Sequence, residues 1–174
     1  NQIDLSREDE TDDAVFYSAP RFVTHIDDGA ISSLRSWYAA NLPMQGNAAI
    51  LDLCSSWISH YPPSLSIARV AGLGMNRAEL ERNEQLTDFV VQDLNKNPTL
   101  PYTDGSFDAI TNAVSVDYLS RPLEVFAELR RVARPGALVA MSFSNRMFFN
   151  KAVHRWVRST EYQRLLMCAS YFHF

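Results

Sequence analysis

The chain has 174 residues, and 47% of them are hydrophobic, which suits one domain with a core of its own. Its formal net charge of −4 argues against a nucleic-acid partner, because binding to phosphates requires a basic face. No apolar run approaches the roughly 20 residues of a membrane helix. Cys54 and Cys168 are the only cysteines and form neither a disulfide framework nor a zinc motif.

These features predict a soluble protein of a reducing compartment. The sequence starts at Asn1 rather than Met and shows no signal peptide. We therefore expect a cytoplasmic protein, or an organellar one (chloroplast or mitochondrion) from which a leader has been removed.

The first 46 residues differ in character from the rest. Residues 1–14 carry six acidic side chains, which is typical of a solvated, flexible arm and alternatively of an acidic docking strip for a basic partner. Residues 15–46 hold aromatic and aliphatic side chains at mixed helical spacing, and Asp27 can start a helix there. We expect a helical lid over a sheet, followed by an α/β core over residues 47–174.

The core alternates short apolar runs with amphipathic segments, as parallel strands alternate with crossover helices. The predicted strands are residues 48–54, 69–73, 88–92, 107–116 and 137–143. The predicted helices are a short one within 55–60, then 76–83, one from the cap Ser120 to Pro135-Gly136, 148–157 and 161–171.

This order predicts a Rossmann-like, doubly wound, mainly parallel sheet of about five strands with helices on both faces. Ligands of such sheets bind beyond the carboxyl ends of the strands. That rule selects the segments to inspect, namely residues 52–60, 74–76, 92–94 and 112–118.

The most specific sequence motifs lie in the second half of the chain. Residues 100–110 read LPYTDGSFDAI, and residues 131–144 read RVARPGALVAMSFS. Together with the strand pattern of residues 48–145, this resembles the core of class I S-adenosylmethionine-dependent methyltransferases, of the type 11 group. The resemblance implies S-adenosylmethionine as cofactor and transfer of its methyl group to an acceptor that the sequence does not identify.

The third strand end fits this resemblance. Asp93 stands where the family has an acidic residue that accepts a hydrogen bond from the adenine amino group, and Leu94 would lie against the adenine face. An ionised carboxylate is an acceptor only, which suits an exocyclic NH₂ donor. The alternative is that Asp93 merely ends a strand.

The first two strand ends depart from the family. Asp52 occupies the family's acidic position, but no glycine turn follows it. Instead the small residues Cys54 and Ser55 follow, whose backbone N–H groups and hydroxyl could still bind the methionine carboxylate of the cofactor, and then the bulky Trp57 stands where the turn should be narrow. The family's ribose-binding acid is replaced by Gly74. Two neighbours could take part there: Met75, and Asn76, whose alternative role is that of a helix N-cap.

The fourth strand end offers candidates for the acceptor side. Asn112 is a candidate cofactor-binding residue, and Asp117 is a weak candidate for a general base. The four histidines share no spacing with carboxylates, so we expect no metal site.

The family core normally closes with an antiparallel strand hairpin, and the sequence given stops at Phe174 before any such hairpin, so either the protein continues beyond these residues or a partner chain covers the sheet edge. The fifth strand would then be an open edge that a protein partner could cover, together with the C-terminal aromatics Tyr171, Phe172 and Phe174. Two functions of different classes stay open, and binding of another nucleotide in the same crevice is a third possibility. One is an active methyltransferase. The other is an inactive methyltransferase-like subunit, structural or regulatory, of a larger complex.

Overall fold

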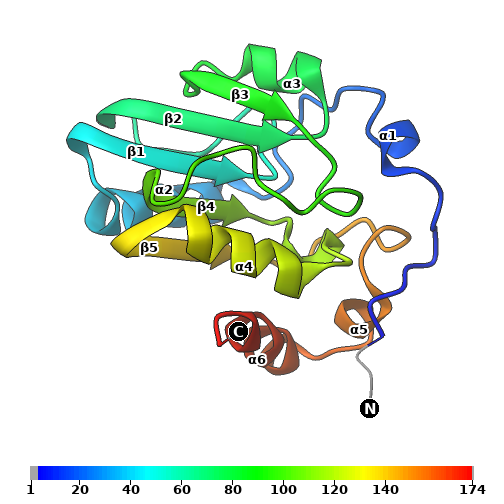
Figure 1. The fold of residues 1–174 in the computed structure, drawn as a ribbon. Coiled ribbons are helices and arrows are strands. Elements are labelled where there is room, and N and C mark those ends of the chain that lie inside the picture. Colours follow the sequence, from blue (N-terminus) through cyan, green and yellow to red (C-terminus); the bar gives the residue numbers. More distant parts are fainter. Residues whose placement is uncertain (1–3, 174) are drawn as a thin grey trace.

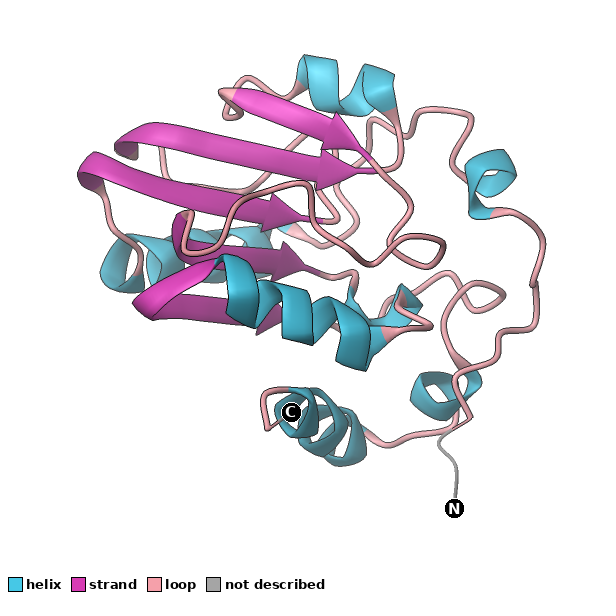
Figure 2. Cartoon of the chain, viewed as in Figure 1, coloured by secondary structure: helices cyan, strands magenta, loops and turns pink. Residues whose placement is uncertain are grey.

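A computed structural model describes residues 4–173 of the chain. Its centre is a five-stranded sheet in the order β3-β2-β1-β4-β5, in which every neighbouring pair of strands runs parallel (Figures 1 and 2). The predicted doubly wound fold is thereby confirmed. The strands are β1 (Gln45–Leu53), β2 (Ser66–Gly74), β3 (Asp88–Val91), β4 (Phe107–Ala113) and β5 (Ala133–Ser142).

The apolar runs form strands because both faces of the sheet are covered. Successive side chains of β1 point to opposite faces. Ile50 packs with Tyr38 and Leu42 of the α2 side, whereas Leu51 and Leu53 belong to a second hydrophobic cluster that includes α4 and α6. A strand that is buried on both sides reads as a continuous apolar run rather than an alternating one.

The helices form layers on the two faces of this sheet. α2 lies on one face, whereas α4 and α6 lie on the other, with α3 beside β2 (Figure 1). Within the described residues, no helix is long and apolar enough to cross a bilayer. The helical elements are α1 (Asp13–Phe16), α2 (Asp28–Asn41), α3 (Arg77–Arg82), the 3-10 turn η1 (Val116–Tyr118), α4 (Pro122–Val132), α5 (His154–Val157) and α6 (Glu161–Tyr171).

Several predicted helices differ from the observed ones. No helix forms within residues 55–60, because both Cys54 and His60 adopt positive φ. Ser120 is not the cap of α4: Arg121 takes that place without a side-chain bond, and the Ser120 amide donates to the side chain of Asn95. Of the helix predicted over 148–157, only α5 forms.

The end of α4 also differs. The helix stops at Val132, and Pro135-Gly136 lies inside β5 rather than at the helix end. Proline disfavours helical geometry in the residue before it, and Gly136 has φ +85. Strand pairing with β4 then begins at Ala133.

Within residues 15–46, the segment predicted as a helical lid over the sheet, α2 is the main helix. α2 packs flat on the sheet through Tyr38, which is buried with Leu42 against Ile50. The C-terminal aromatic Tyr171 is likewise covered by its own chain, because its ring lies 5.3 Å from that of Phe126. Phe174 lies outside the described residues.

The described part of the acidic arm is also not a solvated tail. Arg7 forms an isolated antiparallel bridge with Val153, and the Asp9 amide donates to the Asn150 carbonyl over 2.8 Å. The segment therefore runs beside the loop that precedes α5 (Figure 1). Residues 1–3 lie outside the described part of the chain.

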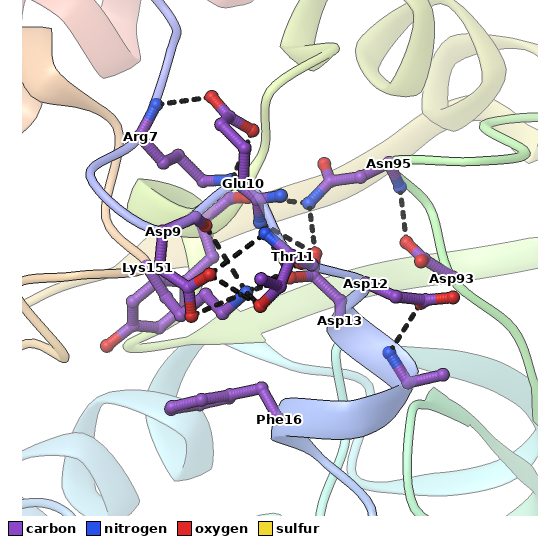
Figure 3. Close-up of polar contacts among 12 residues, drawn as sticks. Arg7, Asp9, Glu10, Thr11, Asp12, Asp13, Phe16, Asp93, Asn95 and Lys151 are labelled. Atoms are coloured by element: carbon purple, nitrogen blue, oxygen red, sulfur yellow. Dashed lines mark hydrogen bonds and ion pairs between the residues drawn. The ribbon is translucent and has the colours of Figure 1, made fainter.

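A buried cation explains why the acidic segment packs. The Lys151 side chain is fully buried, and its Nζ lies 3.1 Å from carboxylate oxygens of both Asp9 and Asp13 and 2.8 Å from the Thr11 carbonyl (Figure 3). Arg7 donates to both oxygens of Asp13. Burial alone would raise the pKa of Asp13, but these donors and Asn95 lower it below its ordinary value. The acids of the segment thus neutralise an otherwise isolated cation.

Replacing Lys151 should destabilise the fold strongly. Lys151→Met leaves Asp13 buried with less compensation, and we expect a loss of about 3 kcal/mol in the free energy of unfolding, because breaking a buried pair strands its remaining charge. Urea denaturation followed by circular dichroism measures this loss. Lys96→Met is the matched control. It removes the exposed ion pair with Asp12, at 2.6 Å, and should have a much smaller effect. Equal effects of the two substitutions would contradict a structural role for the buried cluster.

Candidate functional site

Two adjoining cavities lie at the carboxyl ends of the strands. The larger has a volume of about 260 Å³ and the smaller about 90 Å³. Both are lined by Tyr17, Cys54, Ser115 and Tyr118, so they meet along these four residues. Position alone marks this crevice as the ligand site of a doubly wound sheet.

The structure brings most of the sequence-predicted site residues to these cavities. Asp52, Cys54 and Ser55 line the larger one. The smaller cavity is lined by Gly74, Met75, Asp93 and Leu94 and also by Cys54. The side chains that were selected from three separate strand ends therefore converge on one crevice.

The smaller cavity combines apolar walls with the carboxylates of Asp93 and of Asp13, which is paired with Arg7 and Lys151. Leu94 and Leu73 are buried and line it. The Asp93 Oδ1 accepts bonds from the amides of Asn95, at 2.9 Å, and Lys96, at 3.3 Å. Among the described residues both bonds fall on Oδ1, so Oδ2 can accept from a ligand. A flat, largely apolar group with an NH₂ donor at its edge matches this cavity.

The loop after β1 closes over the end of β2. The Ser55 amide donates to the Leu73 carbonyl over 2.8 Å. A Cβ atom added at Gly74 would lie 2.1 Å from the Ser55 carbonyl oxygen. Because real atoms do not approach so closely, any side chain at position 74 is excluded, including an acidic one.

Asn76 is engaged in structural contacts. Its Oδ1 accepts from the Glu79 amide over 3.1 Å, which makes it the N-cap of α3. Its Nδ2 donates to the Tyr17 carbonyl over 2.8 Å and to the Ser18 carbonyl over 3.2 Å. Asn76 therefore anchors the N-terminal segment beside the crevice, and it lines neither cavity.

Glu79 is a buried acid of the site that the sequence did not point out. Its Oε1 accepts from the Arg21 amide over 2.7 Å, and its Oε2 accepts from the Ser56 hydroxyl over 2.6 Å. It thus joins the N-terminal segment, the loop after β1 and α3 at the wall of the larger cavity. Its place three residues after the N-cap is the only sequence signal that concerns it.

Asp52 is buried beneath the loop that follows it. Its Oδ2 accepts from the hydroxyls of Ser55 and Ser59, both over 2.6 Å. Burial raises the pKa of Asp52 to about 6, and the hydroxyl donors oppose that rise. Burial also raises the pKa of the Cys54 thiol to about 12, so Cys54 is a neutral thiol at pH 7 rather than a nucleophile.

Backbone strain gathers at the larger cavity. Within residues 4–173, the non-glycine residues with positive φ are Cys54 at 57°, His60 at 60° and Val114 at 47°, and all three line this cavity. A β-branched residue such as Val114 rarely adopts this conformation. Strain of this kind persists where surrounding structure imposes it, and it is typical of functional sites.

Besides Asn76, two other predicted residues lie outside the linings of both cavities. Asp117 is buried in η1, where burial raises its pKa to about 7 and its Oδ2 has no partner within the described residues. The Asn112 Nδ2 donates to the Leu53 carbonyl over 3.1 Å, which ties β4 to β1. The described residues also hold no group of three or more His, Cys, Asp or Glu suited to a metal ion.

The N-terminal segment contributes lining residues that sequence reasoning missed. Tyr17 lies at the junction of the cavities, and both Arg21 and His25 line the larger one. Phe148 comes from the loop after β5 and contacts the ring of Phe16 at 5.3 Å. None of these positions belongs to a strand end, so the topological rule did not select them.

Comparison with known proteins identifies the domain. Residues 55–141 match the family described as "Methyltransferase domain". The chain belongs to this family. Its sheet also matches a SAM-dependent methyltransferase from Aquifex aeolicus, with a TM-score of 0.55 and 18% identity over 84% of this chain and 88% of that one.

Curated relatives match over shorter segments. A demethylmenaquinone methyltransferase from Renibacterium salmoninarum is 35% identical over 77 residues, which are 44% of this chain and 31% of that protein. A ubiquinone/menaquinone biosynthesis C-methyltransferase from Ruegeria sp. is 29% identical over 100 residues, 57% of this chain and 34% of that protein. The matched part thus spans about a third of each relative.

Restoring the family's acid at position 74 should damage the fold. We expect both Gly74→Asp and Gly74→Ala to lower the free energy of unfolding by about 2 kcal/mol or more, because either Cβ collides with the Ser55 carbonyl. Gly29→Ala is the control, since its Cβ would meet only an Asp27 side-chain oxygen, at 3.3 Å. Thermal and urea unfolding measure the difference. A stable Gly74→Asp variant would show that the loop after β1 does not lie against β2.

Proposed function

We propose that this protein is an S-adenosylmethionine-dependent methyltransferase. The adenosine part of the cofactor would occupy the smaller cavity, and its methionine end would extend into the larger one. The observation that supports this best is the joining of the two cavities beside Asp93 and Leu94 in a chain of the methyltransferase family. Bound S-adenosylmethionine would supply an electrophilic methyl group.

The adenine end of the site fits the cofactor. The free Oδ2 of Asp93 is suited to accept from the adenine amino group, and Leu94 with Leu73 offers an apolar face to the ring. These two walls come from β2 and from the turn after β3, so the sheet itself fixes their spacing. We assign them as the adenine subsite.

The ribose end fits less well. No side chain can project from Gly74, and Asn76 is committed to the cap of α3 and to the Tyr17 carbonyl. The ribose would therefore lie against the main chain of Gly74 and Met75. Without an acid to accept from both ribose hydroxyls, we expect weaker binding of the cofactor than this fold can achieve.

The larger cavity would hold the methyl acceptor. Ser115 and Tyr118 supply hydroxyl groups at the junction with the cofactor. Burial lowers the pKa of His25, so its imidazole is neutral at pH 7 and can take a proton from an acceptor. Asp117, the base that the sequence suggests, lines neither cavity and would have to act through a movement of η1.

A second function is favoured by the closed loop over β2 and by an apolar groove beside β5. In this alternative the domain is a catalytically inactive subunit, structural or regulatory. β5 pairs only with β4 in the described chain, and a groove beside it is lined by Leu34, Trp37 and Met141. A protein partner would then cover this groove.

Binding of S-adenosylhomocysteine to the full-length protein separates the two functions. We expect micromolar affinity by isothermal titration calorimetry. Asp93→Ala should weaken it about tenfold or more, because the adenine loses its acceptor. Asp93→Asn keeps a side-chain oxygen that can accept from the adenine amino group, so it should bind S-adenosylhomocysteine more tightly than Asp93→Ala. The exposed Asp104→Ala is the matched control and should bind as the unsubstituted protein does. If the full-length protein does not bind S-adenosylhomocysteine, the result supports the inactive subunit instead.

A further inference from the structure

Arg21 is a guanidinium without an anionic partner at the wall of the larger cavity. Its Nη2 donates to the Phe16 carbonyl over 2.9 Å. Its Nη1 is buried and has no hydrogen-bond partner within the described residues. A buried donor without a partner is unfavourable and uncommon in folded proteins, so an acceptor that reaches Nη1 would relieve this cost.

Aromatic rings hold this guanidinium in place. The Arg21 Cζ lies 4.4 Å from the ring centroid of Phe16 and 5.4 Å from that of Phe148. The side chain is thus fixed between the N-terminal segment and the loop after β5. A guanidinium that is already oriented loses little freedom when it binds an anion.

The same cavity contains a second arginine without a carboxylate partner. Only the backbone amide of Arg146 is engaged, with the Ser144 hydroxyl at 3.1 Å, and its side chain forms no ion pair among the described residues. Most other arginines of the described chain, such as Arg7, Arg69 and Arg131, pair with carboxylates. Arg21 and Arg146 differ from the remaining arginines without a carboxylate partner because both line the larger cavity.

The acids of the cavity do not neutralise these arginines. Asp52 accepts from the hydroxyls of Ser55 and Ser59. Glu79 accepts from the Ser56 hydroxyl and from the backbone amide of Arg21, not from its guanidinium. The carboxylates of the cavity already accept hydrogen bonds from the protein, whereas the two guanidiniums have no carboxylate partner. The cavity is therefore suited to an added anion.

We propose that Arg21, assisted by Arg146, forms a subsite for the carboxylate of a small-molecule ligand. The assignment of this subsite to a ligand of the methyltransferase site rests on the proposed function, whereas its preference for a carboxylate does not. The planar fork of a guanidinium matches a carboxylate in a bidentate geometry. In this chain the turn after β1 lacks glycine, so a side chain rather than the main chain would supply the donors for an anionic group.

The carboxylate has two possible sources, the amino-acid end of the cofactor and an acidic methyl acceptor. Two matched ligand pairs distinguish them by calorimetry on the full-length protein. S-adenosylhomocysteine and 5′-methylthioadenosine share the nucleoside thioether and differ in the amino-acid end. Benzoate and benzamide, added with S-adenosylhomocysteine present in excess, share size and differ in charge.

The variants are Arg21→Gln and Arg146→Gln, with Arg21→Lys to keep the charge without the fork. Arg155→Gln is the control, because Arg155 is exposed on α5 and lines neither cavity. Thermal unfolding of each variant checks that the fold is kept. The carboxylate-bearing member of at least one pair should bind about tenfold more tightly, and Arg21→Gln should remove that preference while Arg155→Gln keeps it.

A preference within the first pair assigns the subsite to the cofactor, and a preference within the second assigns it to the acceptor. If neither nucleoside binds, the proposed function fails, and the benzoate pair then tests the subsite by itself. Absence of any charge preference in both pairs would overturn the inference. So would a preference that survives in both Arg21→Gln and Arg146→Gln.

Discussion

The contact between the Ser55 backbone and Gly74 determines the form of the site. The amide of Ser55 donates to the Leu73 carbonyl, and its own carbonyl lies where a side chain of residue 74 would begin. This contact holds the loop after β1 over the end of β2 and keeps Asp52 beneath it. The contact therefore accounts for the glycine at position 74, where the resemblance implies a ribose-binding acid.

The N-terminal segment completes what the sheet begins. Lys151 pairs with acids of this segment and holds it against the body of the domain. Asn76 and Glu79 bind the backbone of the segment near Tyr17 and Arg21. The segment thereby supplies residues that line both cavities. The wall of the crevice depends on a buried lysine more than 130 residues away in the sequence (Figure 3).

The parts of this structure that the sequence predicts are those set by local patterns and topology. Apolar runs such as residues 48–54 identify the strands because both faces are covered, and parallel connection brings Asp52, Gly74 and Asp93 to one edge. The packing of residues 4–14 could not be predicted, since the acids resemble a solvated arm until Lys151 is known to be buried beside them. The roles of Arg21 and Glu79 were missed for the same reason, because they arise from contacts between segments distant in the sequence. The clash that a side chain at position 74 would make with the Ser55 backbone cannot be predicted from the residue types of the loop after β1.

The most direct test of the central claim is a crystal structure of the full-length protein with S-adenosylhomocysteine. The account predicts the adenine between Leu73 and Leu94 with its amino group on Asp93, the thioether near Cys54, and the loop after β1 still against Gly74. A nucleoside bound elsewhere on the molecule would contradict it. So would a loop that swings away from β2 to admit the ligand.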